Sequence, residues 1–412
     1  MTVDPSTGQP DAALSRRSLL RGAVTVGAGL AFGPTLLAAC GGGDGAGAGA
    51  AGSSSTLGAA TASKSSGSDA IAAARQRLDA ARAVPTFLPP GPAIDASSLA
   101  GKKLFYLAIT FNVEIVQNLY KGVREAAQAV GMTAKSYDCK GDPSLYVAGF
   151  EQAINQGYDC VLLESIPNSL VAEPMRRAID AGIKVVMINE VMETGPGDPR
   201  AHAQVAFDYV GGALLDADWV LNDSGGKDIN LVVFHAENLR HRAMAKAIKD
   251  RIESSCVGGC KVRLEQVNYA DFATRLPTLT QTLVTSDASI NYMIPVIDGM
   301  SLNIVPGIRQ AGAADRVKVA SYNGTGSVLE MLGRGEVVGA DIGGPHAWEG
   351  WLDVDAAIRV LLDQPPPAGE VKPPNRLFDS TNIGTLDLGA AEGTWYNTDA
   401  AKAGFRKLWN VA

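Results

Sequence analysis

Between residues 102 and 362 the sequence alternates short apolar runs with longer amphipathic stretches, and this alternation restricts the possible folds more than any other feature. The apolar runs, such as 104–109 and 184–188, are continuous, which is typical of strands that are buried on both faces. The stretches between them have the period of amphipathic helices. This order predicts parallel β-α-β units whose sheets are covered by helices on both sides.

The predicted elements form two sets, separated by a segment around residues 204–208. In the first set we expect strands at 104–109, 132–137, 160–163 and 184–188 and helices at 114–130, 144–156 and 170–181. In the second set we expect strands at 229–234, 262–267, 292–295, 317–321 and 337–342 and helices at 211–221, 240–254, 272–284, 301–311, 327–332 and 348–362. The fold class is therefore α/β, with two doubly wound, Rossmann-like lobes and a hinge. We expect an N-terminal lobe of residues 101–207 and 343–370, and a C-terminal lobe of residues 208–342 and 371–412. In such sheets ligands bind beyond the carboxyl ends of the strands.

The first 40 residues have the features of an export signal. Two arginines, Arg16 and Arg17, precede a short run rich in glycine and alanine, which is too short and too rich in glycine to form a stable membrane-spanning helix. The sequence Leu37-Ala38-Ala39-Cys40 resembles a bacterial lipobox, and this resemblance implies cleavage before Cys40 and lipidation of its thiol. A plain secretory signal with a chance cysteine is the alternative. On either interpretation the mature protein works outside the cytoplasm.

Residues 41–100 are predicted to form a low-complexity tether and a stalk. Gly, Ala and Ser dominate 41–68, so this part cannot bury enough apolar surface to offset its chain entropy. Residues 69–84 have a helical pattern, and the prolines of 85–92 favour an extended segment. We expect these pieces to hold the body away from a lipid anchor.

Apart from Cys40 the chain has four cysteines, and the predicted export would place them in an oxidising compartment. Cys256 and Cys260 are separated by Val-Gly-Gly, and a local disulfide between them is the favoured interpretation. A zinc site would need two further ligands nearby, and the sequence supplies none at suitable spacing. Cys139 and Cys160 are expected to be separate buried residues.

Composition and motifs weigh against several functions. The chain of 412 residues is 46% hydrophobic with a formal net charge of −7, whereas nucleic-acid binding needs clustered Lys and Arg. No G-x-S-x-G, H-E-x-x-H or P-loop pattern is present, so no enzyme class is indicated and no cofactor or metal is expected. A glycosidase-like pair among Glu164, Glu190 and Asp298 is a weaker alternative.

From Lys102 onward the chain resembles the type I periplasmic binding proteins, the solute receptors of sugar ABC importers, and in particular the ribose-binding-protein-like members. The resemblance rests on several short segments that occur in the family's order. They are Phe111-Asn112, 118–123, 157–163, 181–189, 208–212, Tyr269-Ala-Asp-Phe272 and Tyr322-Asn-Gly-Thr325.

The resemblance implies a set of ligand-binding residues that end strands or begin helices around the cleft. These are Phe111, Asn112, Glu164, Ser165, Asn189, Glu190, Asp208, His235, Arg240, Arg242, Phe272, Asp298, Asn323 and Trp348. Several positions depart from the family pattern. Asn189 stands where relatives often have Asp and Glu190 where they have Arg, while Ile297, Asn323 and Gly343 replace Asn, Asp and Gln. A small polar solute is therefore better supported than a sugar.

Several of these residues also have a structural interpretation. Asp208 and Asn323 can cap the helices that follow them, and Phe272 can be a core residue. Only one of Arg240 and Arg242 is expected to point inward. Trp351 is expected in the core, whereas Trp348 can line the cleft near the hinge.

Together these observations predict a monomeric, lipid-anchored receptor for a small solute. Binding would close the hinge, and the closed form would dock on an ABC permease served by a separate ATPase. A sensory receptor of the same fold, coupled to a signalling partner, is the alternative.

Overall fold

The computed structural model describes residues 67–192, 200–364, 372–390 and 392–411. The predicted export signal, with Cys40, and the tether up to residue 66 lie outside the described residues. By its internal contacts the chain divides after Ala62, and all described residues belong to the second unit, 63–412. Within the described ranges, no helix is both long and apolar enough to cross a bilayer.

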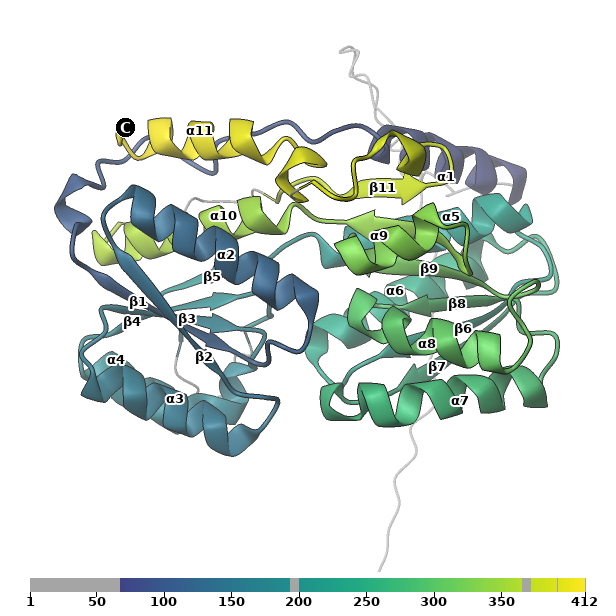
Figure 1. The fold of residues 1–412 in the computed structure, drawn as a ribbon, viewed down its shortest axis with the longest axis horizontal. Helices are drawn as coiled ribbons and strands as arrows, with labels where there is room; N and C mark the ends of the chain where they lie inside the picture. Colours follow the sequence, from purple (N-terminus) through teal and green to yellow (C-terminus); the bar gives the residue numbers. More distant parts are fainter. Residues whose placement is uncertain (1–66, 193–199, 365–371, 391, 412) are drawn as a thin grey trace, which may run out of the picture. The chain divides into compact units, whose positions relative to one another are not determined.

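The N-terminal lobe is built on a parallel five-stranded sheet with the order β2-β1-β3-β4-β5 (Figure 1). Its strands are β1 (Lys103–Ala108), β2 (Thr133–Asp138), β3 (Cys160–Glu164), β4 (Lys184–Ile188) and β5 (Ala203–Val205). Its helices are α2 (Glu114–Ala129), α3 (Pro143–Asn155), α4 (Ala172–Asp180), α10 (His346–Leu361) and α11 (Thr398–Leu408).

Both faces of this sheet are buried, as the continuous apolar runs predict. Phe105 and Leu107 of β1 pack in the core beneath α3 and α4, whereas Leu104 and Tyr106 pack in the core beneath α2 and α10. Gly122 and Gly350 allow α2 and α10 to pack closely, because a Cβ at either glycine would overlap the backbone of the other helix.

The C-terminal lobe contains a six-stranded sheet with the order β11-β10-β9-β8-β6-β7. Its strands are β6 (Asn230–His235), β7 (Lys261–Gln266), β8 (Tyr292–Pro295), β9 (Lys318–Asn323), β10 (Val338–Gly343) and β11 (Arg376–Asp379). All neighbouring strands are parallel except β11, which pairs antiparallel with β10. Its helices are α1 (Gly67–Ala81), α5 (Tyr209–Ser224), α6 (Leu239–Ser255), α7 (Phe272–Ser286), α8 (Asp298–Gln310) and α9 (Gly326–Gly333).

The two sheets place their strand-order reversals at equivalent positions. In the N-terminal lobe the order reverses between β1 and β3, and in the C-terminal lobe between β6 and β8. Loops leave in opposite directions at such a point, so it marks the expected ligand crevice of a doubly wound sheet. The fold class predicted from the sequence is confirmed: two α/β lobes with parallel sheets.

The predicted stalk is wrong for its described part, because residues 67–99 pack on the body. Helix α1 buries Ala74 and Leu78 against the C-terminal lobe, and Arg77 donates to the fully buried carboxylate of Asp218 at 2.6 and 2.9 Å. Farther along, the Ile94 N–H donates to the Leu408 carbonyl in the N-terminal lobe. The helical periodicity was visible in the sequence, but the partner of its apolar face was not.

The C-terminal residues also differ from the predicted lobe boundaries. Strand β11 joins the C-terminal lobe as expected, but α11 packs on α10 of the N-terminal lobe. Trp409 stacks on Trp351 with ring centroids 5.3 Å apart, which confirms that Trp351 is a core residue.

The Cys256–Cys260 disulfide predicted from the sequence is present. It joins the residues between α6 and β7, at the amino end of β7 and so on the opposite side of the sheet from the strand carboxyl ends. Cys139 and Cys160 are buried and unpaired, as expected.

Candidate ligand-binding site

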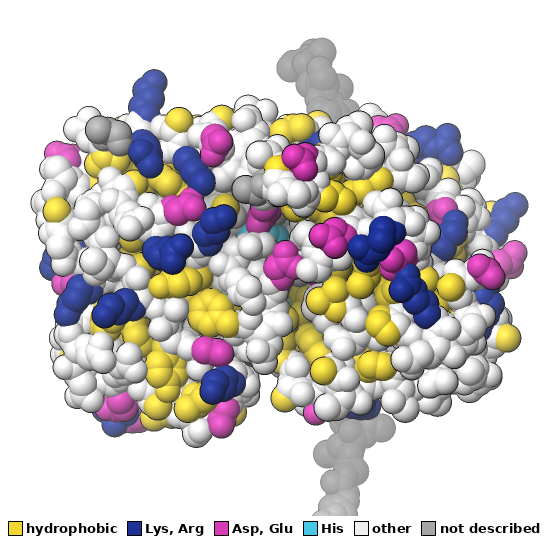
Figure 2. All heavy atoms as spheres, in the orientation of Figure 1, with side chains coloured by type: hydrophobic (Ala, Val, Ile, Leu, Met, Phe, Trp, Pro, Cys, Tyr) yellow, Lys and Arg dark blue, Asp and Glu magenta, His cyan; other side chains and the backbone are white. Residues whose placement is uncertain are grey.

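A cavity of about 410 Å³ lies between the two lobes, and Figure 2 shows the surface hollowed along their boundary. Its walls come from loops that follow the carboxyl ends of β1 and β2 in one lobe and of β7, β8 and β9 in the other. This is the edge at which ligands bind in doubly wound sheets.

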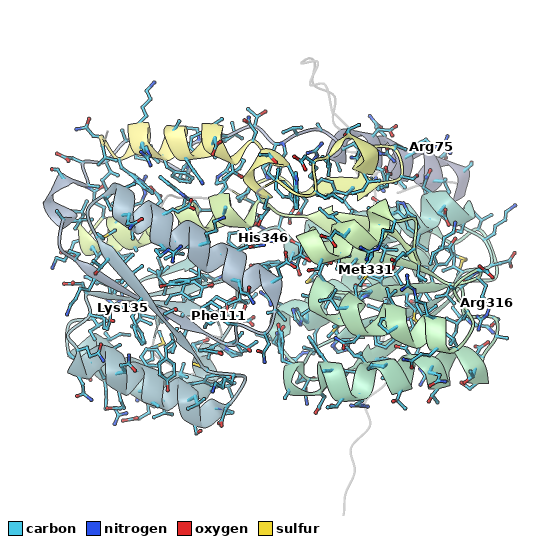
Figure 3. The ribbon with its side chains drawn as sticks, in the orientation of Figure 1. Arg75, Phe111, Lys135, Arg316, Met331 and His346 are labelled. Carbon is cyan, nitrogen blue, oxygen red and sulfur yellow. A yellow bond between two sulfur atoms is a disulfide. The ribbon has the colours of Figure 1, made fainter. Side chains whose placement is uncertain are left out.

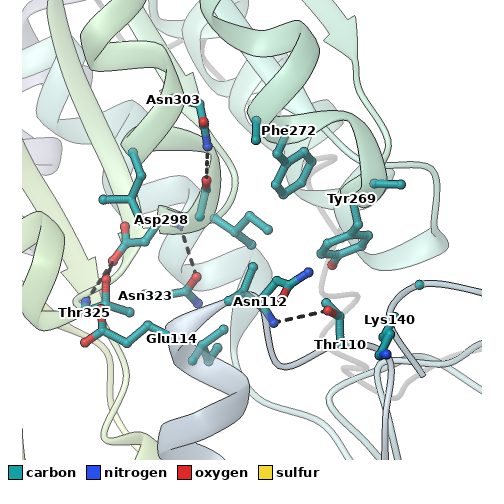
Figure 4. A pocket seen from close by; sticks show the side chains of 18 residues that line it. Thr110, Asn112, Glu114, Lys140, Tyr269, Phe272, Asp298, Asn303, Asn323 and Thr325 are labelled. Carbon is teal, nitrogen blue, oxygen red and sulfur yellow. Dashed lines mark hydrogen bonds between the residues drawn. The ribbon is translucent and has the colours of Figure 1, made fainter. Parts of the chain in front are cut away.

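The N-terminal lobe supplies the part of the wall that follows β1 and β2. Thr110 and Asn112 follow β1, and Lys140 follows β2 (Figure 4). The Thr110 hydroxyl accepts from the backbone N–H of Asn112 at 3.1 Å, and the Asn112 side chain is exposed at the cavity.

The C-terminal lobe supplies an aromatic and an amide-bearing wall. Tyr269 and Phe272 lie against each other with ring centroids 5.2 Å apart. Asn303 and Asn323 lie across from them, and Ile297 lines the same cavity (Figure 4). Aromatic faces and neutral amides are the groups that bind the apolar faces and hydroxyls of small polar solutes.

Asp298 lines the cavity, but its carboxylate is occupied by the protein. Oδ1 accepts from the Ser321 hydroxyl, and Oδ2 accepts from the Thr325 N–H and hydroxyl at 2.8 and 2.7 Å. Burial raises the pKa of Asp298 to about 6, although the Ser321 and Thr325 donors oppose this shift. Asp298 therefore lines the cavity as predicted and also orders the turn after β9.

Glu114 is likewise occupied, and its bonds cross between the lobes. It belongs to the first turn of α2, and its two carboxylate oxygens accept from the Gly326 N–H at 3.1 Å and the Ser327 hydroxyl at 2.7 Å. These residues begin α9 of the other lobe, so Glu114 interacts with the positive end of that helix dipole.

Behind the cavity, Arg240 of α6 forms a second set of bonds between the lobes. Its Nη1 donates to the carbonyl and side-chain oxygens of Asn189 and, at 3.4 Å, to the Ser165 hydroxyl. Its guanidinium carbon lies 4.8 Å from the centroid of the Tyr209 ring, a cation–π geometry. We call Arg240, Asn189, Ser165 and Tyr209 the arginine cluster.

Glu164 orders the arginine cluster from beneath. Its Oε1 accepts from the Ser165 hydroxyl at 2.6 Å and from Asn189 Nδ2 at 2.9 Å. Burial raises the pKa of Glu164, and the bonds from Ser165 and Asn189 partly oppose this. The bond from Nδ2 turns the Asn189 side-chain oxygen toward Arg240.

Four residues at strand carboxyl ends have a left-handed or positive-φ backbone. Lys140, Ser165 and Asn189 have φ of 51°, 55° and 57°, and Asn323 has 138°. For residues other than glycine such conformations cost free energy, and they persist where surrounding contacts impose them, often at functional sites. A second, smaller cavity of about 20 Å³ lies at the arginine cluster. Each of the four residues lines either this cavity or the larger one of about 410 Å³.

Not all predicted site residues meet at the cavities. Asn112, Phe272, Asp298 and Asn323 line the larger one, and Ser165, Asn189, Arg240 and Asn323 line the smaller one. The structural alternative for Asn323, a cap on the helix that follows it, is wrong: its Oδ1 accepts from the Asp298 N–H at the start of α8, and the N-cap of α9 is Thr325.

Seven predicted residues lie outside both linings, and one of them is Glu164, which orders the arginine cluster. Phe111 packs edge-on against Tyr120, and Trp348 is buried beside Phe87. Asp208 caps α5 by accepting from the Gly211 N–H, which matches its structural interpretation.

The other three are also explained by local contacts. Arg242 forms an exposed ion pair with Glu237, so Arg240 is the arginine that points inward. The His235 ring contacts the Ala236 carbonyl, and the Glu190 carboxylate accepts from the Val191 N–H.

Sequence reasoning missed Thr110, Lys140, Tyr269 and Asn303 as site residues. Thr110, Lys140 and Tyr269 lie within three residues after a strand, so the carboxyl-end rule was the available signal. Asn303 had no such signal, because it lies inside α8.

A family model described as the periplasmic binding protein domain matches residues 106–364. The chain belongs to this family. The type I resemblance found in the sequence is thereby confirmed, and the match spans both lobes.

Individual relatives agree with this family. The ribose import binding protein of Bacillus subtilis is 25% identical over 241 residues, which cover 57% of this chain and 75% of that protein. The D-ribose/D-allose-binding protein of Pseudomonas aeruginosa is 22% identical over 252 residues, covering 59% and 76%.

Solved structures share the fold. The 5-methylthioribose transporter solute-binding protein of Thermotoga lettingae has a TM-score of 0.63 at 17% identity, covering 79% of this chain and 100% of that one. The Caulobacter myo-inositol binding protein has a TM-score of 0.60 at 18% identity, covering 70% and 96%.

Proposed function

We propose that this periplasmic binding protein is the extracytoplasmic receptor of an ABC importer. It captures a small polyhydroxylated solute, a sugar or sugar-like compound, between its lobes and delivers it to a membrane permease with a separate ATPase. The observation that carries the proposal is the 410 Å³ cavity, lined by both lobes with two aromatic rings and several neutral amides and hydroxyls. The relatives' ligands, ribose and myo-inositol among them, are of this class.

A binding role without catalysis suits this site. Of the three carboxylates in the glycosidase-like alternative, only Asp298 lines the larger cavity, and both its oxygens accept hydrogen bonds from the protein. An acid–base pair would need two carboxyl groups facing the same solute.

The proposal is tested by a thermal-melt screen of the chain from Gly41 onward, which contains every described residue. The panel comprises pentoses, hexoses, polyols, amino acids and nucleosides. A ligand present at about 100 times its dissociation constant adds about 2.7 kcal/mol of stability, which is readily seen as a rise in melting temperature. Hits confined to amino acids or nucleosides would contradict the proposed solute class.

The hits are then assigned to the cavity by mutation. Asn112→Ala and Asn323→Ala each remove an amide at the cavity and should weaken binding by about 0.5–3 kcal/mol. The control is Asn118→Ala, since Asn118 lies on α2 outside both linings. Asn382→Ala would not serve as a control, because the Asn382 side-chain amide donates a hydrogen bond to a backbone carbonyl of β11. Equal affinities in all three variants would refute the assignment.

We further propose that the protein is a monomer anchored through a lipid on Cys40, after export by the twin-arginine route. Cys40→Ser should then move the protein from the membrane fraction to the soluble extracytoplasmic fraction. Replacing Arg16 and Arg17 by lysines should block export. Membrane association that survives Cys40→Ser would exclude the lipid anchor.

A further inference from the structure

The cavity offers a solute one cation that is unpaired within the described residues and several side-chain hydrogen-bond donors, whereas its carboxylates already accept hydrogen bonds from the protein. Two carboxylates line it, Asp298 and Glu114, and protein donors occupy both oxygens of each. These protein donors use most of the acceptor capacity of each carboxylate and leave little of it for ligand hydroxyls.

Lys140 contributes the cationic group of the lining. It is exposed at the edge of the cavity beside Thr110, and no described residue forms an ion pair with its ammonium (Figure 4). The nearest acidic residues in sequence are oriented by backbone groups: Asp138 accepts from the Lys140 and Phe111 N–H groups, and Asp142 caps α3.

The backbone holds Lys140 in this position. Its φ of 51° is left-handed, and the bond from its N–H to Asp138 at 2.9 Å stabilises the turn. The next residue, Gly141, donates from its N–H to the Ile109 carbonyl at 2.7 Å, which ties the turn to the end of β1. The ammonium therefore extends from an ordered turn at the cavity wall.

Side-chain amides add neutral hydrogen-bond donors to the cavity wall. The Asn112 side chain is exposed at the cavity, and Asn323 uses its oxygen to accept from the Asp298 N–H, which leaves its Nδ2 to face the cavity. Asn303 donates from its Nδ2 to the Gly299 carbonyl, and its side-chain oxygen remains able to accept a hydrogen bond from a ligand hydroxyl.

We propose that the cavity selects a polyhydroxylated solute that carries one acidic group, with that group against Lys140 and its carbon skeleton against Tyr269 and Phe272. This rests on the proposed function and narrows its solute class. A lysine ammonium is a point charge that binds either a carboxylate or a phosphate. The solute is thus a sugar acid or a sugar phosphate.

The test measures calorimetric affinity for matched neutral and acidic solutes: glucose with glucuronate, glucitol with gluconate, and ribose with ribonate and ribose 5-phosphate. We expect at least one acid to bind about tenfold to a hundredfold more tightly than its neutral counterpart, the range of one charge-assisted hydrogen bond. The carboxylate and phosphate members decide which acidic group is preferred.

Lys140→Met is the decisive variant, because it keeps the stem length and the left-handed backbone cost while removing the charge. It should reduce the affinity for the acid to that for the neutral compound and abolish the salt dependence of binding. Lys135→Met is the matched control: Lys135 is exposed on β2, the strand that precedes Lys140, and lies outside both linings (Figure 3). It should leave affinity unchanged.

The outcomes separate this inference from the proposed function. Neutral members that bind as tightly as their acids, or an acid whose affinity survives Lys140→Met, would overturn the inference and leave the receptor function standing. No binding by any neutral or acidic member would overturn both.

Discussion

Arg240 of the C-terminal lobe donates two hydrogen bonds to Asn189 of the N-terminal lobe, and so connects the two lobes directly. Glu164 orients Asn189, and the guanidinium is buried over Tyr209. A binding protein closes around its ligand because both lobes contact the ligand only in the closed state. In this protein the side chain of Arg240 also links the two lobes, through its hydrogen bonds to Asn189.

The first prediction follows from this relationship. Arg240→Met should raise the open fraction of the ligand-free protein, because it removes the bonds to Asn189 and Ser165. Small-angle scattering should report a larger radius of gyration than for the unmodified chain. Arg242→Met, which removes only an exposed ion pair with Glu237, should leave the scattering unchanged. Identical scattering of all three proteins would show that Arg240 does not hold the lobes together.

The second prediction concerns Glu114. Glu114→Gln should lower the free energy of unfolding by about 0.3–1 kcal/mol, because it removes a negative charge from the amino end of α9. Ser327→Ala should add little once Glu114 is replaced, as a double-mutant cycle would show. The control is Glu125→Gln on the same helix, whose partner Lys402 belongs to the N-terminal lobe. Additive effects of Glu114→Gln and Ser327→Ala would mean that the two side chains are not coupled.

The third prediction is a pH dependence at the hinge, where His346 begins α10 as the chain re-enters the N-terminal lobe (Figure 3). Burial lowers the pKa of His346, but the Glu392 carboxylate outweighs it and raises this pKa to about 9. A histidine with a raised pKa stabilises the fold fully below its unfolded value of about 6.5, and the stabilisation is lost as pH rises through 9.

The free energy of unfolding should therefore fall by up to about 3 kcal/mol between pH 6.5 and 9. Urea denaturation at both pH values measures this change. Glu392→Gln should flatten the dependence, because it removes the charge that favours the imidazolium. A slope that is equally steep in this variant would assign the titration to a group other than the His346–Glu392 pair.

The fourth prediction concerns the Cys256–Cys260 disulfide. Replacing both cysteines by serine should lower the free energy of unfolding by about 2 kcal/mol, the chain-entropy value for so short a loop. Solute affinity should not change, since this loop lies at the amino end of β7 and the cavity lies beyond its carboxyl end. A loss of affinity without a loss of stability would contradict this separation.

The sequence alone determined the order and type of the elements. Continuous apolar runs become strands buried on both faces, and the helix starts at Glu114 and Phe272 agree with their predicted positions. It also determined the disulfide, since that pairing needs only residues four apart. These features depend on local chemistry and on burial, which a linear pattern records.

Tertiary structure decided which polar groups remain free for a solute. The sequence marks Asp298 and Lys140 alike as charged residues that follow strands, but partners distant in sequence occupy Asp298, whereas Lys140 is exposed at the cavity. The same holds for Arg240 and Arg242, two residues apart on one helix, of which one crosses between the lobes and the other faces solvent. The physical reason is that a carboxylate or guanidinium takes its role from its hydrogen-bond partners, and long-range packing brings those partners to it.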